Sequence, residues 1–396
     1  MTDTLPNLRI DDDEYDEFRE PLESMCENFP GSYWRDLEDR PLDDRYPQEF
    51  VDALMESGFL SALIPEEYGG AGLPIRTASV ILETIHSTGC NASAAMGQMY
   101  LPDILVRYGS EEQKQKYLPE IATGKLRFLS YAISEPGTSS DIADMATAAE
   151  KRDDSYVVKG AKHWVICAKQ TDLLLLLART SSAGEGGNPH DGISAFLVDM
   201  RTALGNGVKA ELFDAMTSGN AAHLEFEGLE LPLDSLIGAE GKGYGYYSDL
   251  VICESILLAS CLMGDSDYFS ERAVNYANER VVFGRSISHY QGIQFPISKA
   301  YIEVESARLV GIKAAALYDA GQRSGVQASL ANHLAADAAW AMADACFTTH
   351  GGFAFAREYD IERKWKDVRV MRMNPRSTST LLAHIWENEF GGTQLR

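Results

Sequence analysis

The sequence has few basic residues and lacks the short patterns that identify several enzyme classes. Its 396 residues include 35 Lys and Arg against 59 Asp and Glu, a formal net charge of −24 at pH 7. Such a field repels nucleic-acid phosphates and anionic lipid headgroups, so we expect no nucleic acid and no membrane among its partners. The sequence contains no GxGxxG, GxxxxGK[ST] or GxSxG pattern. Rossmann-type dinucleotide binding, P-loop chemistry and elbow-type serine hydrolysis are therefore not predicted.

Cysteine is also scarce, and long apolar runs are absent. The six cysteines are scattered, form no CxxC pair and show no metal-ligand spacing, so we predict buried thiols in a reducing compartment and no metal site. The N-terminal segment resembles neither a secretory signal nor a transit peptide. The longest strongly apolar run, residues 173–178, is far shorter than the ~20 residues that span a bilayer. We therefore expect a cytoplasmic protein.

The periodicity of apolar residues divides the chain into three domains. Helical spacing dominates residues 1–128, short β-branched or Leu-rich segments between turn residues fill 129–240, and long helical patterns return over 241–396. The predicted fold is multidomain α+β: an N-terminal α-helical domain, a compact antiparallel β domain in the middle and a C-terminal bundle of four or five long helices. Within the last part we expect helices that end near Gly264, Gly284 and Gly321.

Glu254 is the strongest candidate for chemistry. It is the only charged residue in LVICESILLASCLMG (250–264), where apolar neighbours occupy every face of the turn that holds it. Such a helix is buried, and burial raises the pKa of a carboxyl group toward that of a base that works near neutral pH. The alternative is an internal ion pair with a downstream arginine such as Arg372 or Arg376.

Three further segments carry weaker signals. SEPGTSSD (134–141) follows an apolar strand with a forced turn, and ERVVFGR (279–285) ends a helix between two arginines. HGGFAFAREYDIERKWKD (350–367) joins paired glycines to several basic residues. Each suits contact with an anion or a phosphate, and each also suits an ordinary turn or helix end.

Taken together and in order, these segments resemble the acyl-CoA dehydrogenase family over nearly the whole chain. Four blocks carry the resemblance: YAISEPGTSSD (131–141), KGAKHWVICA (159–168), ERVVFGRSISHYQ (279–291) and THGGFAFAREYDIERKWKD (349–367). The family's order of a helical domain, a β-barrel and a four-helix bundle agrees with the order predicted above.

The resemblance implies FAD as cofactor and an acyl-CoA as substrate. It places FAD at Tyr131, Ile133, Ser134, Ser140, Trp164, Ile166, Arg280, Phe283, Gln291, Gly351, Gly352 and Ser377. It places the substrate near Ser140, Tyr100, Tyr244, Tyr247 and Ser255, with Gln98 and Met99 as further candidates for the pocket wall. It also implies a homotetramer that passes electrons to an electron-transferring flavoprotein.

The implied reaction is α,β-dehydrogenation of the thioester to the trans-2-enoyl form. A carboxylate removes the α-proton while the β-hydride leaves for flavin N5. Most members carry that base in a loop where this chain has Pro375, whereas isovaleryl-type and long-chain members carry it at the position of Glu254. We therefore expect Glu254 to be the base.

Two departures leave other functions open. Those members usually have Arg where Ser255 stands, and the family usually has Thr or Ser where Ile166 stands. The same fold with changed chemistry is one alternative: enoyl-CoA reduction, decarboxylation, desulfination or an oxygen-using reaction. A non-catalytic partner subunit of a heteromeric dehydrogenase is another.

Overall fold

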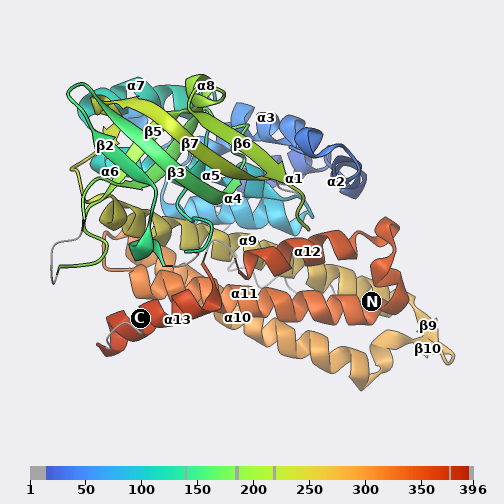
Figure 1. The fold of residues 1–396 in the computed structure, drawn as a ribbon. Coiled ribbons are helices and arrows are strands. Elements are labelled where there is room, and N and C mark those ends of the chain that lie inside the picture. Colours follow the sequence, from blue (N-terminus) through green and yellow to red (C-terminus); the bar gives the residue numbers. More distant parts are fainter. Residues whose placement is uncertain (1–14, 139–140, 183–186, 217–219, 374–375, 392–396) are drawn as a thin grey trace.

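The computed structural model describes residues 15–138, 141–182, 187–216, 220–373 and 376–391 (Figure 1). The N-terminal part is helical: α1 (Asp16–Cys26), α2 (Gly31–Glu38), α3 (Gln48–Glu56), α4 (Ile75–Ser87), α5 (Met96–Tyr100), α6 (Pro102–Tyr108) and α7 (Glu111–Ala122). A reciprocal capping box between Ser110 and Gln113 starts α7. Trp34, Phe50 and Ile81 are among its fully buried residues and fix this part as one packed layer.

The middle part is one eight-stranded sheet. Its strands are β1 (Phe128–Ala132), β2 (Ala148–Lys151), β3 (Ser155–Ile166), β4 (Leu173–Arg179), β5 (Ile193–Asp199), β6 (Val208–Phe213), β7 (Ala221–Pro232) and β8 (Leu236–Ile237), with the short helix α8 (Met200–Ala203) after β5. They follow the order β6-β7-β3-β2-β4-β5-β8, with β1 paired to β4. Most neighbouring strands of this sheet are antiparallel, as predicted. Two pairs depart from that pattern, because β1 and β2 both pair with β4 in parallel.

The central strand β4 is buried on both faces, which explains its run of five leucines. Leu173, Leu175 and Leu177 belong to the large core that the helices share. Leu174 and Leu176, which point the other way, belong to a second core enclosed by the sheet itself. A strand covered on both sides loses the alternation of polar and apolar residues.

The C-terminal part is a bundle around one long helix. Its helices are α9 (Gly243–Glu279), α10 (Gln291–Asp319), α11 (Gly325–His350), α12 (Ile361–Met371) and α13 (Thr378–Phe390), and the hairpin β9 (Val281–Val282) and β10 (Arg285–Ser286) joins α9 to α10. α9 lies in the middle of the molecule and packs against α4, α10 and α11 (Figure 1). In the described part of the chain α9 is the one helix with the length and composition of a membrane span, yet 78% of its most apolar window is buried inside the protein, as in a core helix.

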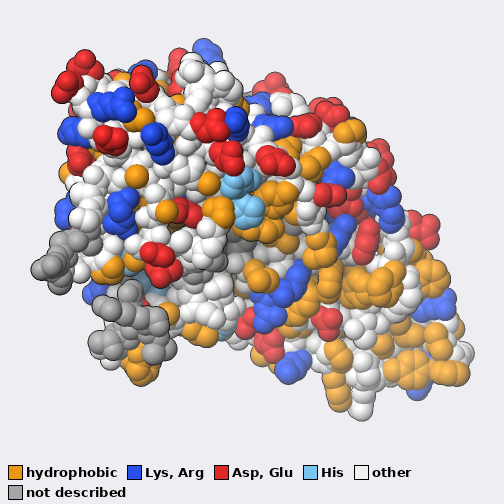
Figure 2. All heavy atoms as spheres, viewed as in Figure 1, with side chains coloured by type: hydrophobic (Ala, Val, Ile, Leu, Met, Phe, Trp, Pro, Cys, Tyr) orange, Lys and Arg blue, Asp and Glu red, His pale blue; other side chains and the backbone are white. Residues whose placement is uncertain are grey.

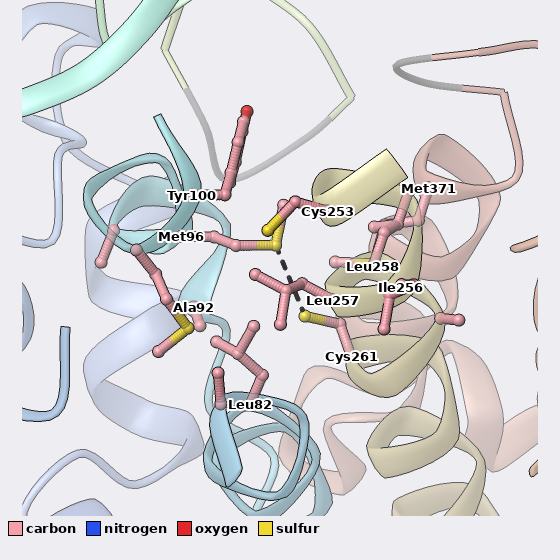
Figure 3. Packing of buried hydrophobic residues seen from close by; sticks show 14 of the residues in the cluster. Leu82, Ala92, Met96, Tyr100, Cys253, Ile256, Leu257, Leu258, Cys261 and Met371 are labelled. Carbon is pink, nitrogen blue, oxygen red and sulfur yellow. Dashed lines mark hydrogen bonds between the residues drawn. The ribbon is translucent and has the colours of Figure 1, made fainter. Parts of the chain in front are cut away.

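Gly264 does not end a helix, contrary to the expectation from the sequence. It lies within α9, where a Cβ atom would stand 2.1 Å from the main-chain oxygen of Glu83 in α4. Its role is close helix packing, and the missing side chain lets the two backbones touch. Figure 3 shows the same region, where Leu82 of α4 faces Leu257 and Cys261 of α9.

We predict that Gly264→Ala lowers the free energy of unfolding by about 1–3 kcal/mol, because the added methyl group overpacks the contact between α4 and α9. Urea denaturation measures the change. Gly245→Ala in the same helix is the control, since a Cβ atom there meets nothing within 4 Å and alanine favours the helix. Equal stabilities of Gly264→Ala and the wild type would show that the helices have room to separate.

Candidate active site

Glu254 lies where the three parts of the chain meet. Its side chain comes from the middle of α9 and the residue is 3% exposed. The hydroxyl of Tyr100, from the end of α5, donates to Oε1 at 2.8 Å. The hydroxyl of Tyr131, from β1, donates to the same oxygen at 3.0 Å. One carboxylate oxygen therefore accepts two hydrogen bonds from two other domains, while Oε2 has no donor among the described residues.

Burial and hydrogen bonding act in opposite directions on this carboxyl group. Removal from water raises the pKa of Glu254 above its usual value, and this effect is the largest. The hydrogen bonds from Tyr100 and Tyr131 and the charge of Arg376 each lower that pKa. The net direction is upward, which suits a group that must accept a proton near neutral pH.

Neither arginine considered from the sequence forms an ion pair with Glu254. Arg372 pairs instead with Asp337, with an Nη2–Oδ1 distance of 2.7 Å. Arg376 donates to the hydroxyl of Ser255, the next residue along α9. Its positive charge therefore lies near Glu254 without direct contact, and the carboxylate stays available for chemistry.

The carboxylate faces a cavity of about 180 Å3. Eight of the residues singled out from the sequence line it: Tyr100, Tyr131, Ile133, Ser134, Trp164, Ile166, Tyr247 and Glu254. Most of the remaining wall near Glu254 is apolar and includes Ala94, Met96, Leu129 and Leu258. Figure 3 shows that Tyr100 points away from the packed Leu82 and Leu257 side chains. The fold thus brings the base candidate and part of the expected flavin site into one cavity.

A buried ion pair fixes the segment of Ile133 and Ser134. Lys162 of β3 is fully buried and donates to the main-chain oxygen of Ile133 and to Glu135, each at 2.9 Å. Glu135 also accepts from the main-chain nitrogens of Ala146 and Thr147. Burial lowers the pKa of Lys162 to about 8, even though the charge of Glu135 opposes that shift. The turn after β1 is therefore held rigidly beside the cavity.

An irregularity in β3 turns two rings toward the cavity. The pairing of β3 with β7 shifts between Lys162 and Val165, and Trp164 has a φ of +58°. His163 and Trp164 both line the cavity, although successive residues of a regular strand point to opposite faces. Trp164 is 53% exposed on this wall, so a planar ligand has an indole face to stack on.

Five of the expected cofactor residues lie elsewhere, at the far end of the bundle. Arg280 directly follows α9, Phe283 lies in the turn between β9 and β10, and Gln291 is the first residue of α10. Gly351 and Gly352 follow α11 in a short 3-10 helix (Gly351–Phe355). The guanidinium of Arg280 lies 5.8 Å from the ring centre of Phe353, so the two segments adjoin. None of the five lines the cavity. Figure 2 shows hydrophobic side chains gathered over this end of the molecule, and Phe283 is 93% exposed.

The remaining expected residues are placed as follows. Tyr244 stacks on His190, with ring centres 3.7 Å apart, and does not line the cavity. The hydroxyl of Ser255 donates to the main-chain oxygen of Val251. Ser377 caps α13 by accepting from the main-chain nitrogen of Thr380. Ser140 lies outside the described residues. Gln98 is not a pocket residue, because its side chain bonds the main chain of Ile121, Leu126 and Phe128.

Two titratable side chains of the cavity wall, those of Asp367 and His163, were missed in the sequence. Asp367 is 4% exposed and lines the cavity, and burial raises the pKa of its carboxyl group. A signal existed, because Asp367 shares one face of α12 with the buried Lys364 and Ile361 at helical spacing. His163 had no comparable signal, since its orientation depends on the irregularity in β3.

Comparison with known proteins places each part of the chain in one family. Residues 12–125, 130–229 and 241–374 match the N-terminal, middle and C-terminal domains of acyl-CoA dehydrogenase. Cyclohex-1-ene-1-carbonyl-CoA dehydrogenase of Syntrophus aciditrophicus is 32% identical over 83% of this chain and 79% of its own length. A 3-(aryl)acrylate reductase of Clostridium sporogenes is 29% identical over 82% of this chain and 86% of its own length.

A solved structure gives the same result for the fold. The acyl-CoA dehydrogenase of Geobacillus kaustophilus superposes with a TM-score of 0.88 at 26% identity, and the match covers 98% of this chain and 100% of that one. The sequence matches, the shared domain order and this superposition agree. The chain belongs to the acyl-CoA dehydrogenase family, whose members depend on FAD.

Proposed function

We propose that this protein is an FAD-dependent dehydrogenase of acyl-CoA thioesters that uses Glu254 as its base. The observation that carries the proposal is a carboxylate that is buried, bonded through one oxygen only and open to a cavity. Oε1 is occupied by Tyr100 and Tyr131, so Oε2 is the atom that receives the α-proton of the thioester. Burial supports the transfer by keeping the carboxyl group a stronger base than one in water.

The cavity fits the cofactor of the family. The exposed indole of Trp164 offers a stacking face, and Ser134 and Ile133 form a wall that the Lys162–Glu135 pair holds in place. FAD, when bound, supplies the acceptor for the hydride. Ile166 lines the cavity where the resemblance places Thr or Ser, so this wall contributes no side-chain hydroxyl at that position.

A reductase is the second candidate, and the similarity to the 3-(aryl)acrylate reductase supports it. The same base, run in reverse, returns a proton to the α-carbon. Anaerobic mixing separates the two directions: a dehydrogenase bleaches its flavin with a saturated acyl-CoA, whereas a reductase is reoxidised faster by an enoyl-CoA than it is reduced by the saturated form.

A homotetramer is proposed from the surface of α10. Phe295, Ile302 and Leu309 recur every seven residues along this helix and are 60%, 65% and 62% exposed. Residues at that spacing share one face, and an exposed apolar stripe marks a protein interface. In such an assembly the Arg280 and Gly351 segments would hold the ADP part of a neighbouring subunit's FAD, and electrons would leave to an electron-transferring flavoprotein.

The base is tested by Glu254→Gln, which keeps the shape of the side chain and removes its basicity. We expect normal FAD content and a rate of anaerobic flavin bleaching by the best acyl-CoA of a panel that is roughly 10²–10⁴-fold lower. Stopped-flow absorbance measures the rate. Bleaching at the wild-type rate in this variant would reject Glu254 as the base.

The two phenols are tested by their effect on the pH profile. Tyr100→Phe and Tyr131→Phe each remove a hydrogen bond that lowers the pKa of Glu254, so the rising limb of the bleaching rate should move to higher pH. A hydrogen bond to a charged group contributes about 1.5–3 kcal/mol, which predicts a rate on the acidic limb that is roughly 10- to 150-fold lower. The double variant should move further. Unchanged profiles would mean that the phenols do not act on the base.

Cofactor retention is tested by Arg280→Ala. We expect FAD to be lost on dilution and gel filtration, because the arginine side chain is proposed to bind the cofactor's diphosphate. Arg201→Ala is the control, since Arg201 is exposed and pairs only with Asp199 among the described residues. Equal FAD content in the two variants would refute the assignment.

A further inference from the structure

One face of α9 runs along the cavity and presents a second polar side chain beside the base. Tyr247 and Glu254 are seven residues apart, which places them on the same side of the helix two turns from each other. Both line the cavity, and Leu258 continues the same face one turn further on. Tyr247 is 8% exposed, so most of the residue is buried.

The three tyrosines around Glu254 differ in what their hydroxyls do. Those of Tyr100 and Tyr131 donate to Glu254. The ring of Tyr247 lies edge-on to that of Tyr131, with ring centres 6.1 Å apart at 68°. Its hydroxyl has no hydrogen-bond partner within the part of the chain that the structure describes. The hydroxyls of Tyr100 and Tyr131 are therefore bonded to the base, whereas the hydroxyl of Tyr247 is available to a ligand.

A free hydroxyl in this wall discriminates between ligands. Apolar side chains, among them Met96, Leu129 and Leu258, form much of the cavity wall and cannot bond a hydroxyl. A substrate that fills the cavity displaces water, so an alkyl chain leaves the Tyr247 hydroxyl unpaired and an acyl chain with an oxygen atom satisfies it. Leaving a buried donor unpaired is the costly case in molecular recognition.

We propose that Tyr247 is a specificity-determining residue that hydrogen-bonds an oxygen atom in the acyl chain of the substrate. The substrate class is then a short acyl thioester with a hydroxyl or carbonyl oxygen beyond the β-carbon. This inference rests on the proposed function and adds the substrate class to it.

The test uses pairs of substrates with equal numbers of heavy atoms. 4-Hydroxybutyryl-CoA is compared with pentanoyl-CoA, and 5-hydroxypentanoyl-CoA with hexanoyl-CoA, in the FAD-loaded wild type and in Tyr247→Phe. We expect the wild type to prefer the hydroxylated member of at least one pair by tenfold or more in kcat/KM for flavin reduction. Tyr247→Phe should lose this preference, because the reaction of the hydroxyacyl-CoA slows much more than that of the alkyl substrate.

The control is Tyr246→Phe at the adjacent position of α9. Tyr246 accepts a hydrogen bond from the main-chain nitrogen of Ala239 and stacks on Tyr108, outside the cavity wall. It should keep the wild-type ratio. FAD content and melting temperature of both variants report on folding. The proposal would be overturned if kcat/KM in Tyr247→Phe fell equally for both members of a pair. It would also be overturned if the wild type did not prefer the hydroxyacyl-CoA in either pair.

Binding without turnover separates this inference from the proposed function. Titration of the oxidised protein with each thioester, followed by the flavin spectrum, gives dissociation constants. A tenfold preference for the hydroxyacyl-CoA that Tyr247→Phe abolishes supports the inference even if no saturated thioester bleaches the flavin, an outcome that refutes only the dehydrogenase. Bleaching with equal affinities for both members of each pair refutes only the role of Tyr247.

Discussion

The structure depends on keeping one carboxyl group out of water without neutralising it with a cation. Glu254 lies in the buried middle of α9 among apolar residues, and the two groups that donate hydrogen bonds to it are neutral phenols. Such donors stabilise the anion less than a direct ion pair, so the carboxylate remains basic. Arg376, whose charge acts on Glu254, donates to the hydroxyl of Ser255 and forms no ion pair with the carboxylate. A carboxylate that is strongly desolvated and only weakly stabilised by its hydrogen bonds is better suited to act as a base than one in a structural salt bridge.

The site also depends on the arrangement of the domains. Tyr100, Tyr131 and Glu254 come from a helix end, a strand and a second helix that are far apart in the chain. A small shift of one domain against another breaks a bond to Oε1. The close packing of α9 on α4 at Gly264 and the rigid turn held by Lys162 and Glu135 limit such shifts. Features remote from the carboxylate therefore set its geometry.

Much of this could be predicted from the sequence, and the failures have physical causes. A single acid in a fifteen-residue apolar run is enough to predict a buried carboxyl group, and changes of periodicity gave the domain order. The partners of Glu254 could not be found, because Tyr131 is 123 residues away and its bond depends on how three domains pack. Gly264 was misread as a helix end, since close packing and termination both select glycine. His163 points toward the cavity because of the register shift in β3, and no pattern of residues in the sequence predicts that shift.

The five leucines of β4 affect how the protein unfolds. Because alternate side chains of this strand belong to the core shared with the helices and to the core inside the sheet, neither core can be hydrated while the other stays dry. The middle domain therefore cannot separate from the helical parts as an intact unit. Despite its three domains, the protein should melt in a single cooperative transition.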